Sequence, residues 1–266
     1  MIRPLTPDDI SGALELCRTA GWNQLHQDWS RLIRYEPEGC FAAEVDGALV
    51  GTVTTTSYGT DLAWIGMMLV HERYRRRGIA TELMNASLEY LDDRSVQCIK
   101  LDATPLGRPV YERLGFQAEW SFQRWECQEI GKPVDRATEF LVGAQFDLDR
   151  VAFAADRTAW LKEVAKDSAV CVRDGGFGMI RPGAVATYLG PVVAASPELA
   201  LDVIDQLLQG TRSGPVFWDV MNEQAATIAA SLGFSPIRDL TRMWMGKRLV
   251  SPPMNLQFAI SDPGTG

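Results

Sequence analysis

The chain has 266 residues, of which 46% are hydrophobic and 23% charged, with a formal net charge of −8 at pH 7. This is the balance of a globular protein large enough for one large or two small domains. The acidic charge argues against nucleic acid as a main partner, because phosphate binding depends on clustered positive charge. No segment approaches membrane-spanning length and Met1 opens no apolar leader, so we expect a cytoplasmic protein without a membrane partner.

Cysteine and histidine are too sparse to organise the fold. The five cysteines are widely spaced and form no CxxC pair, and the chain has only two histidines. We therefore expect neither a disulfide framework nor a metal site. Most of the cysteines are predicted to be small core residues.

The first sixty residues predict short strands and helices. A strand is expected at Ile2–Leu5, followed by a helix whose apolar residues run from Ile10 to Cys17 and by a second helix from about Gln27. Asp46-Gly47 separates two apolar runs and predicts a hairpin.

The stretch from Asp61 to Phe116 predicts a strand, a turn, a helix and a second strand. The strand candidate covers 62–70, the basic turn 71–78, the helix 79–91 and the second strand 98–103. Two parallel strands need such a helical crossover between them. An α/β fold with a mixed central sheet flanked by helices is the expected class.

The basic turn is a candidate phosphate site. A helix start leaves its first N–H groups without intrahelical partners, and its dipole favours negative charge there. Gly78 allows close approach of the backbone to a ligand, and Arg75, Arg76 and Arg77 add positive charge. Together these features suit a pyrophosphate.

Three linked motifs resemble the GNAT superfamily of acyl-CoA-dependent N-acyltransferases. They are Val70 before the turn, Arg75-Arg-Arg-Gly-Ile-Ala80 within it, and Tyr111-x-x-x-Gly115-Phe116 downstream. The resemblance implies acetyl-CoA as co-substrate, with no metal. It implies that the strand end, comprising Met68, Leu69 and Val70, lies along the pantetheine arm, and that the turn from Arg75, Arg76 and Arg77 through Gly78 to Ile79 and Ala80 holds the pyrophosphate.

The resemblance also implies roles in catalysis. An amine would attack the thioester directly, a backbone N–H near Val70 would stabilise the oxyanion, and Tyr111 would protonate the leaving thiolate. Three residues at the break after the first helix become acceptor-pocket candidates: Trp22, Asn23 and His26. A large aromatic beside a helix break, such as Trp22, is more often a packing anchor, and Tyr111 could also be a helix residue that packs on the sheet.

The general base is the gap in this pattern. Many GNAT enzymes place a glutamate four residues before the position of Val70, where this chain has Gly66. Asp61, Glu44 and Asp102 are alternatives, with Asp102 the best placed near the end of its strand. Asp102 could instead cap the helix of Tyr111, and a water relay or an already neutral amine would also serve.

The second half of the chain repeats part of the first. Leu101-Asp102 continues to Leu114-Gly115-Phe116 and Arg124, while Trp218-Asp219 continues to Leu232-Gly233-Phe234 and Arg242. The repeat lacks a basic turn, so a second coenzyme site is not expected. We predict a catalytic GNAT domain over 1–130, a linker over 131–146, a degenerate GNAT-like domain over 147–250 and a mobile tail over 251–266.

Two functions remain open from the sequence. The first is an enzyme that acetylates a primary amine, small molecule or peptide, in a pocket shaped by both domains. The alternative is a non-catalytic acyl-CoA sensor or protein-binding module, which the missing glutamate at position 66 favours. The sequence fixes neither the acceptor, the acyl chain length nor the oligomeric state.

Overall fold

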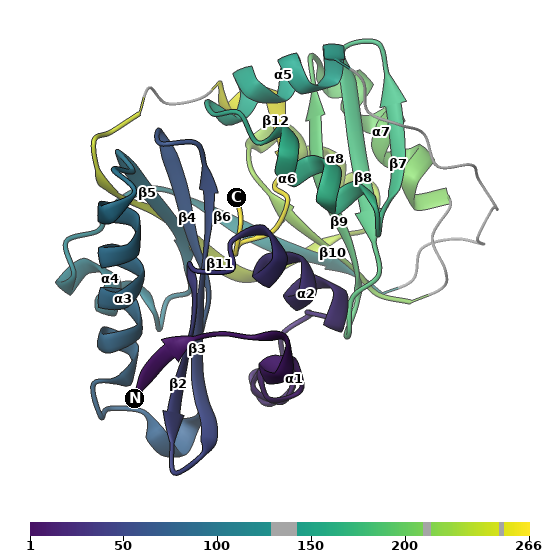
Figure 1. The fold of residues 1–266 in the computed structure, drawn as a ribbon. Coiled ribbons are helices and arrows are strands. Elements are labelled where there is room, and N and C mark those ends of the chain that lie inside the picture. Colours follow the sequence, from purple (N-terminus) through teal and green to yellow (C-terminus); the bar gives the residue numbers. More distant parts are fainter. Residues whose placement is uncertain (129–142, 210–213, 250–252) are drawn as a thin grey trace.

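The computed structural model describes residues 1–128, 143–209, 214–249 and 253–266 (Figure 1). The N-terminal half, residues 1–128, contains β1 (Ile2–Pro4), η1 (Pro7–Asp9), α1 (Ile10–Thr19), α2 (His26–Tyr35), β2 (Cys40–Val45), β3 (Ala48–Tyr58), β4 (Leu62–Val70), η2 (Glu72–Tyr74), α3 (Ile79–Asp93), β5 (Cys98–Ala103), α4 (Arg108–Arg113) and β6 (Gln117–Cys127). The C-terminal half, residues 143–266, contains α5 (Gly143–Phe153), α6 (Thr158–Ala165), β7 (Ala169–Arg173), β8 (Gly176–Arg181), β9 (Thr187–Ala194), α7 (Pro197–Gln209), β10 (Val216–Val220), α8 (Glu223–Ser231), β11 (Ser235–Gly246), η3 (Met254–Leu256) and β12 (Gln257–Ala259).

The described strands form one continuous sheet of twelve strands, in the order β1-β2-β3-β4-β5-β11-β6-β10-β12-β9-β8-β7. The expected α/β class is confirmed, and so is the hairpin at Asp46-Gly47, whose residues both have positive φ, at 51° and 78°. The halves exchange strands at the centre. β11 lies beside β5 of the other half, and β6 lies beside β10 (Figure 1).

A pair of buried ion pairs marks the exchange. Arg242 of β11 faces Asp102 of β5 and donates to both carboxylate oxygens at 2.8 Å. Arg124 of β6 faces Asp219 of β10 and makes the same bidentate contact at 2.9 and 2.6 Å. The Asp and Arg positions of the sequence repeat therefore pair between halves.

Helices cover both faces of the sheet. On one face of the N-terminal half, α3 packs Ile79 and Leu83 against Ile65 of β4. On the other face a single core runs through both halves, joining Trp29 of α2 and Trp64 of β4 to Trp160 of α6. A separate core lies under α7 and α8 in the C-terminal half. Because one core crosses between the halves, they do not fold as two separate bodies.

The predicted division of the chain needs correction where it can be compared. β6 lies inside the expected first domain but pairs with β10 and β11 of the second. Residues 143–146 of the expected linker belong to α5, and the rest of that linker lies outside the described residues. The prediction of a mobile tail is wrong for 253–266, because β12 pairs within the sheet and Phe258 is fully buried.

Four of the five cysteines are buried, as their reading as core residues predicted. Burial raises the pKa of the Cys17 and Cys40 thiols to about 12, so both stay protonated at neutral pH.

Candidate active site

Strands β4 and β5 run parallel only at their beginnings. Their matched pairs are Leu62 with Cys98, Ala63 with Ile99 and Trp64 with Lys100, after which the pairing stops, while the other edge of β5 stays paired with β11 from Cys98 to Ala103. The C-terminal ends of β4 and β5 therefore part. Backbone N–H and C=O groups that face such an opening can bind a ligand, because they make no hydrogen bonds to a neighbouring strand there.

A bulge in β4 lies beside this opening. Thr52 of β3 pairs with Leu69 and Thr54 pairs with Gly66, so two residues of β4 stand opposite one of β3. Met67, one of the two, has a φ of 51°, and its carbonyl oxygen accepts a hydrogen bond from Thr52 Oγ1 at 2.8 Å. The left-handed residue turns the strand locally, which redirects the backbone of Met67 and Met68.

The basic turn follows β4 and ends at the first turn of α3. Arg76 and Gly78 both have positive φ, at 61° and 85°, with Arg77 between them. When left-handed and right-handed backbone conformations alternate along the chain, several backbone N–H groups point to the same side. Such an arrangement makes a concave site for an anion. A Cβ placed on Gly78 would meet no atom within 4 Å, so the space in front of the cradle is open. The fifteen-residue helix α3 adds its dipole.

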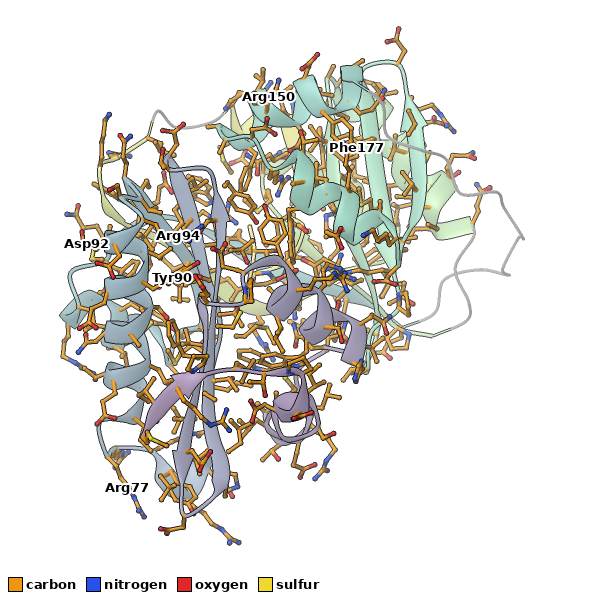
Figure 2. All side chains as sticks on the ribbon, viewed as in Figure 1. Arg77, Tyr90, Asp92, Arg94, Arg150 and Phe177 are labelled. Atoms are coloured by element: carbon orange, nitrogen blue, oxygen red, sulfur yellow. The ribbon has the colours of Figure 1, made fainter. Side chains whose placement is uncertain are left out.

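The three arginines of the turn are exposed to solvent. Arg75 Nε donates to the carbonyl oxygen of Val70 at 3.1 Å, while Arg77 donates to the carbonyl oxygen of Arg73 and lies over the ring of Tyr74. Arg77 projects from the edge of the molecule (Figure 2). The predicted cradle residues thus come together around the start of α3, with Ile79 buried beneath it.

Tyr111 lies on α4, on the face of the sheet that α3 also covers. Its ring packs edge-on against Phe116 with centroids 6.1 Å apart. Burial raises the pKa of Tyr111 to about 12, so the hydroxyl carries its proton at neutral pH. That protonation state is the one that a proton donor to a thiolate requires.

The space beside Gly66 is filled by the end of the chain. A Cβ on Gly66 would lie 2.3 Å from the carbonyl oxygen of Gly264, a backbone atom that cannot rotate away. Tyr58 Oη donates to the Thr265 carbonyl at 2.5 Å and Trp64 Nε1 donates to the Pro263 carbonyl at 3.1 Å. The position where related enzymes hold a glutamate is therefore covered by residues 261–266, which we call the C-terminal segment.

The three carboxylates considered as the base have other surroundings. The Asp102 side chain is 0% exposed and closed off by Arg242, whose guanidinium is 2% exposed. Burial raises the pKa of Asp102 against the opposing effect of Arg242. Glu44 pairs with Arg3 at 2.8 Å, and Asp61 is exposed at the start of β4. The geometry gives Asp102 a buried structural partner in Arg242.

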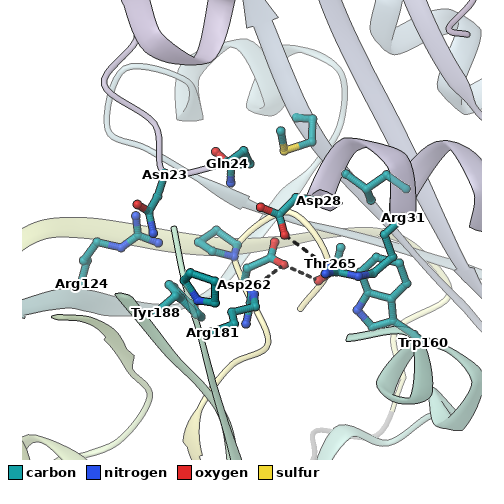
Figure 3. A pocket seen from close by; sticks show the side chains of 14 residues that line it. Asn23, Gln24, Asp28, Arg31, Arg124, Trp160, Arg181, Tyr188, Asp262 and Thr265 are labelled. Carbon is teal, nitrogen blue, oxygen red and sulfur yellow. Dashed lines mark hydrogen bonds and ion pairs between the residues drawn. The ribbon is translucent and has the colours of Figure 1, made fainter. Parts of the chain in front are cut away.

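A cavity lies between the halves, next to the β4 bulge (Figure 3). The N-terminal half contributes residues around the start of α2 together with Met67 and Arg124. The C-terminal half contributes residues from α6, β8, β9 and the C-terminal segment. The lining residues are Asn23, Gln24, Asp28, Arg31, Leu32, Met67, Arg124, Trp160, Arg181, Pro182, Tyr188, Asp262, Pro263 and Thr265.

Of the three predicted acceptor residues, only Asn23 lines this cavity. Its side chain donates to the Ala186 carbonyl at 2.8 Å and accepts from the N–H groups of Val185 and Ala186. Asn23 therefore joins the halves with its polar atoms already engaged. Trp22 packs against the core shared by the halves, and His26 is exposed with Nδ1 3.2 Å from Ser30 Oγ.

Several cavity residues had no signal in the sequence. Arg31 pairs with Asp28 and Asp167, and Arg181 donates to the carbonyl oxygens of Gly190 and Ser261. These residues come from distant segments, so only the assembled sheet shows that they line one cavity. The sequence repeat includes Asp219 and Arg124, but it does not predict that these two residues contact each other.

A parted pair of parallel strands, a strand bulge and an anion cradle at a helix start define an acyl-CoA-dependent acyltransferase. Comparison with known families agrees. Residues 8–116 match the model described as "Acetyltransferase (GNAT) family", and residues 146–259 match that described as "Acetyltransferase (GNAT) domain". The chain belongs to the GNAT superfamily and carries two of its domains in tandem. Membership implies an acyl-CoA thioester as co-substrate.

Several known proteins match this chain across both of its halves. The uncharacterized N-acetyltransferase YitH of Bacillus subtilis is 28% identical over 84% of this chain and 82% of its own. The crystal structure of a protein from Pyrococcus horikoshii assigned as an acetyltransferase superposes with a TM-score of 0.84 at 26% identity, covering 100% of this chain and 95% of that one. A tandem GNAT protein from the clavulanic acid biosynthesis pathway shares the fold, with a TM-score of 0.61 at 14% identity over 94% and 99% of the two chains.

No helix among the described residues is long and apolar enough to cross a membrane. They also contain no group of three or more His, Cys, Asp or Glu side chains placed to hold a metal ion.

Proposed function

We propose that the protein transfers an acetyl group from acetyl-CoA to a primary amine by direct attack of the amine on the thioester. The observation that carries this proposal is the juxtaposition of two features. The parted ends of β4 and β5 lead to the phosphate cradle at α3, and the bulge at Met67 borders the cavity between the halves. A thioester lying in the opening would then face an acceptor in the cavity.

The residues of the cradle supply binding and orientation. Backbone N–H groups from Arg76 to Ala80 hold the pyrophosphate, and the exposed guanidinium groups of Arg75, Arg76 and Arg77 add long-range attraction. Met68, Leu69 and Val70 present backbone groups along the edge of β4 that β5 leaves open. Holding the thioester and the amine together converts a bimolecular reaction into an effectively unimolecular one.

The chemical step needs charge stabilisation and several proton movements. The ammonium nitrogen gives up one proton before it bonds to the carbonyl carbon and a second as the amide forms, and the carbonyl oxygen becomes an oxyanion that a backbone N–H of the β4 bulge can stabilise. When the C–S bond breaks, Tyr111 donates its phenolic proton to the departing sulfur and later regains one from solvent. The products are an N-acetyl amine, free coenzyme A and one proton, because the acceptor enters as an ammonium ion.

The test is coenzyme A release over a panel of small amines and short peptides, with products identified by mass spectrometry. The proposal expects wild-type turnover with at least one amine and a large loss of kcat in Tyr111→Phe with little change in the affinity for acetyl-CoA. Binding of acetyl-CoA with no acceptor turned over would overturn the enzymatic proposal. Slow hydrolysis alone, with a partner protein captured only in the presence of acetyl-CoA, would support the sensor alternative instead.

A further inference from the structure

The C-terminal segment and Gly66 depend on each other. Any side chain at position 66 would collide with the backbone of Gly264, so a glutamate there and the segment in its present place exclude one another. The segment is fixed by several buried groups. Its carbonyl oxygens accept from Tyr58, Trp64 and Arg157, and the Thr265 side chain is 1% exposed. A segment with this many buried hydrogen bonds is a fixed part of the structure that lines the site, and it is not loosely bound.

The C-terminal segment brings the carboxylate of Asp262 close to Gly66, where β4 has no acidic side chain. Asp262 lines the cavity together with Met67, the residue that follows Gly66 (Figure 3). Asp262 Oδ1 accepts the N–H of Gly264 at 2.7 Å, and Gly264 lies directly against Gly66. The carboxylate is thus oriented from its own loop and positioned beside the site of the missing glutamate.

The remaining partners of Asp262 leave it room for a ligand. Oδ2 accepts from Thr265 Oγ1 at 3.0 Å and from Arg181 Nη2 at 3.3 Å, the latter contact being an ion pair. Arg181 makes its two shorter contacts, both 2.8 Å, to the carbonyl oxygens of Gly190 and Ser261. The Asp262 side chain is 18% exposed, in contrast to the 0% exposure of Asp102 and Asp219. Each carboxylate oxygen can accept more than one hydrogen bond.

A second group in the cavity points to the same ligand chemistry. Gln24 Oε1 is buried and has no hydrogen-bond partner among the described residues, although a buried amide oxygen normally has one. Asp28 also lines the cavity, but its oxygens accept from the Leu25 N–H at 2.8 Å and from Arg31 at 3.1 Å. Within the described chain, Gln24 Oε1 has no donor, and Asp262 Oδ1, which accepts only the Gly264 N–H, can take a further hydrogen bond, so the two oxygens suit a ligand that carries N–H donors.

On the basis of the proposed function, we infer that Asp262 binds the ammonium group of the acceptor amine, taking the place of the acidic side chain absent at Gly66. Gln24 Oε1 accepts a second N–H of the same group. The substrate class is therefore a small cationic primary amine, because the C-terminal segment occupies much of the space between the halves. The acceptor loses its proton to water at the carboxylate before or during attack.

The test compares Asp262→Asn and Asp262→Glu with the wild type, using the best acceptor of the amine panel and acetyl-CoA. Asparagine keeps the size of the side chain and can still accept the Gly264 N–H, so the segment should stay in place. We expect Asp262→Asn to raise the KM for the amine about tenfold or more, as loss of a charge-assisted hydrogen bond would. The KM for acetyl-CoA should stay within about twofold of the wild type. Asp262→Glu should recover most of the amine affinity, and Asp8→Asn, on the surface near α1, controls for the change in net charge.

The outcomes separate this inference from the proposed function. If the wild type turns over an amine and Asp262→Asn has an unchanged KM for it, the role of Asp262 is refuted while the enzymatic proposal stands. An equal rise in both KM values, or no recovery with glutamate, would show that Asp262 only packs the segment, and this also refutes the inference. If the wild type turns over no amine, the proposed function fails and takes this inference with it.

Discussion

Replacing Asp102 by asparagine separates a structural carboxylate from a catalytic one. The substitution preserves the shape of the side chain but leaves the guanidinium of Arg242, only 2% exposed, without its counter-ion. Removing one partner of a fully buried ion pair costs about 3–5 kcal/mol. Three aromatic rings surround Arg242, with centroids 4.4 Å away for Trp64, 5.2 Å for Trp120 and 5.5 Å for Phe122. Their faces attract a cation, so we expect a loss near the lower end, about 3 kcal/mol.

The assay is reversible urea unfolding, supported by thermal melting. A chain of this length should lose roughly 6–12 °C in Tm for that change. Asp102→Leu combined with Arg242→Met removes both charges and should recover most of the stability, because no charge is then left unpaired. The matched control is Asp219→Asn. Its partner Arg124 is 11% exposed and borders the cavity, so water can reach the guanidinium and the loss should be smaller.

Kinetics of the same variant complete the test. At a temperature where Asp102→Asn is folded, its kcat should lie within about threefold of the wild type, since the carboxylate is fully buried against Arg242. The reasoning is refuted if Asp102→Asn unfolds with wild-type stability but loses kcat a hundredfold or more. That result would make Asp102 the general base.

Three further predictions address the coenzyme site and the N-terminal helix. Tyr111→Phe should lower kcat about a hundredfold. Because burial raises the pKa of Tyr111 to about 12, deprotonation of this hydroxyl should not lower the wild-type kcat between pH 8 and 10. A decrease in kcat over this range that is absent in Tyr111→Phe would contradict this. Gly78→Val should weaken acetyl-CoA binding by about tenfold or more, as measured by calorimetry. The control is Gly59→Val in the turn after β3, where the glycine has a φ of 67° and equally open surroundings. This control should cost similar stability and leave acetyl-CoA binding unchanged. The third concerns Asp9, whose pKa Arg3 lowers to about 2, below an unfolded value near ~3.9. This pair therefore stabilises the fold above about pH 4 and is lost as the pH falls through about 2, so Asp9→Asn should cost about 1–2 kcal/mol at pH 7 and flatten the unfolding free energy between pH 4 and 2.

Local patterns predicted the elements of the N-terminal half well. The apolar spacing in α3, the Asp46-Gly47 turn and the run from Leu62 to Val70 each act through neighbours in sequence. The position of the basic turn was predictable for the same reason, since Arg75 to Gly78 are consecutive and a helix start needs no distant partner; its role as a coenzyme cradle stays a prediction. The structure places all of these residues as the local pattern indicated.

Long-range pairing was beyond the reach of these patterns. β6 and β11 have similar lengths and occupy corresponding places in the repeat, so alternation alone cannot say which half each joins. The choice is made by contacts such as Arg242 with Asp102, which are 140 residues apart. The sequence pattern did not predict the position of the C-terminal segment, for a related reason. The Pro, Gly and Asp content of the segment indicates mobility, but side chains as distant in sequence as Tyr58 and Arg157 donate hydrogen bonds to its backbone and hold it in place.

The last fourteen residues treat the two described strand openings differently. β9 and β10 pair in parallel from Thr187 with Val216 to Leu189 with Trp218 and then part, as β4 and β5 do. In this second opening β12 bonds to both strands, and Trp218 Nε1 donates to the Phe258 carbonyl at 2.8 Å. A pantetheine arm would have to displace a strand of the sheet. The chain then continues from β12 to Gly66 of the other half, so closing one opening also positions the wall of the other. One docked segment therefore both fills the opening between β9 and β10 and excludes a side chain at position 66.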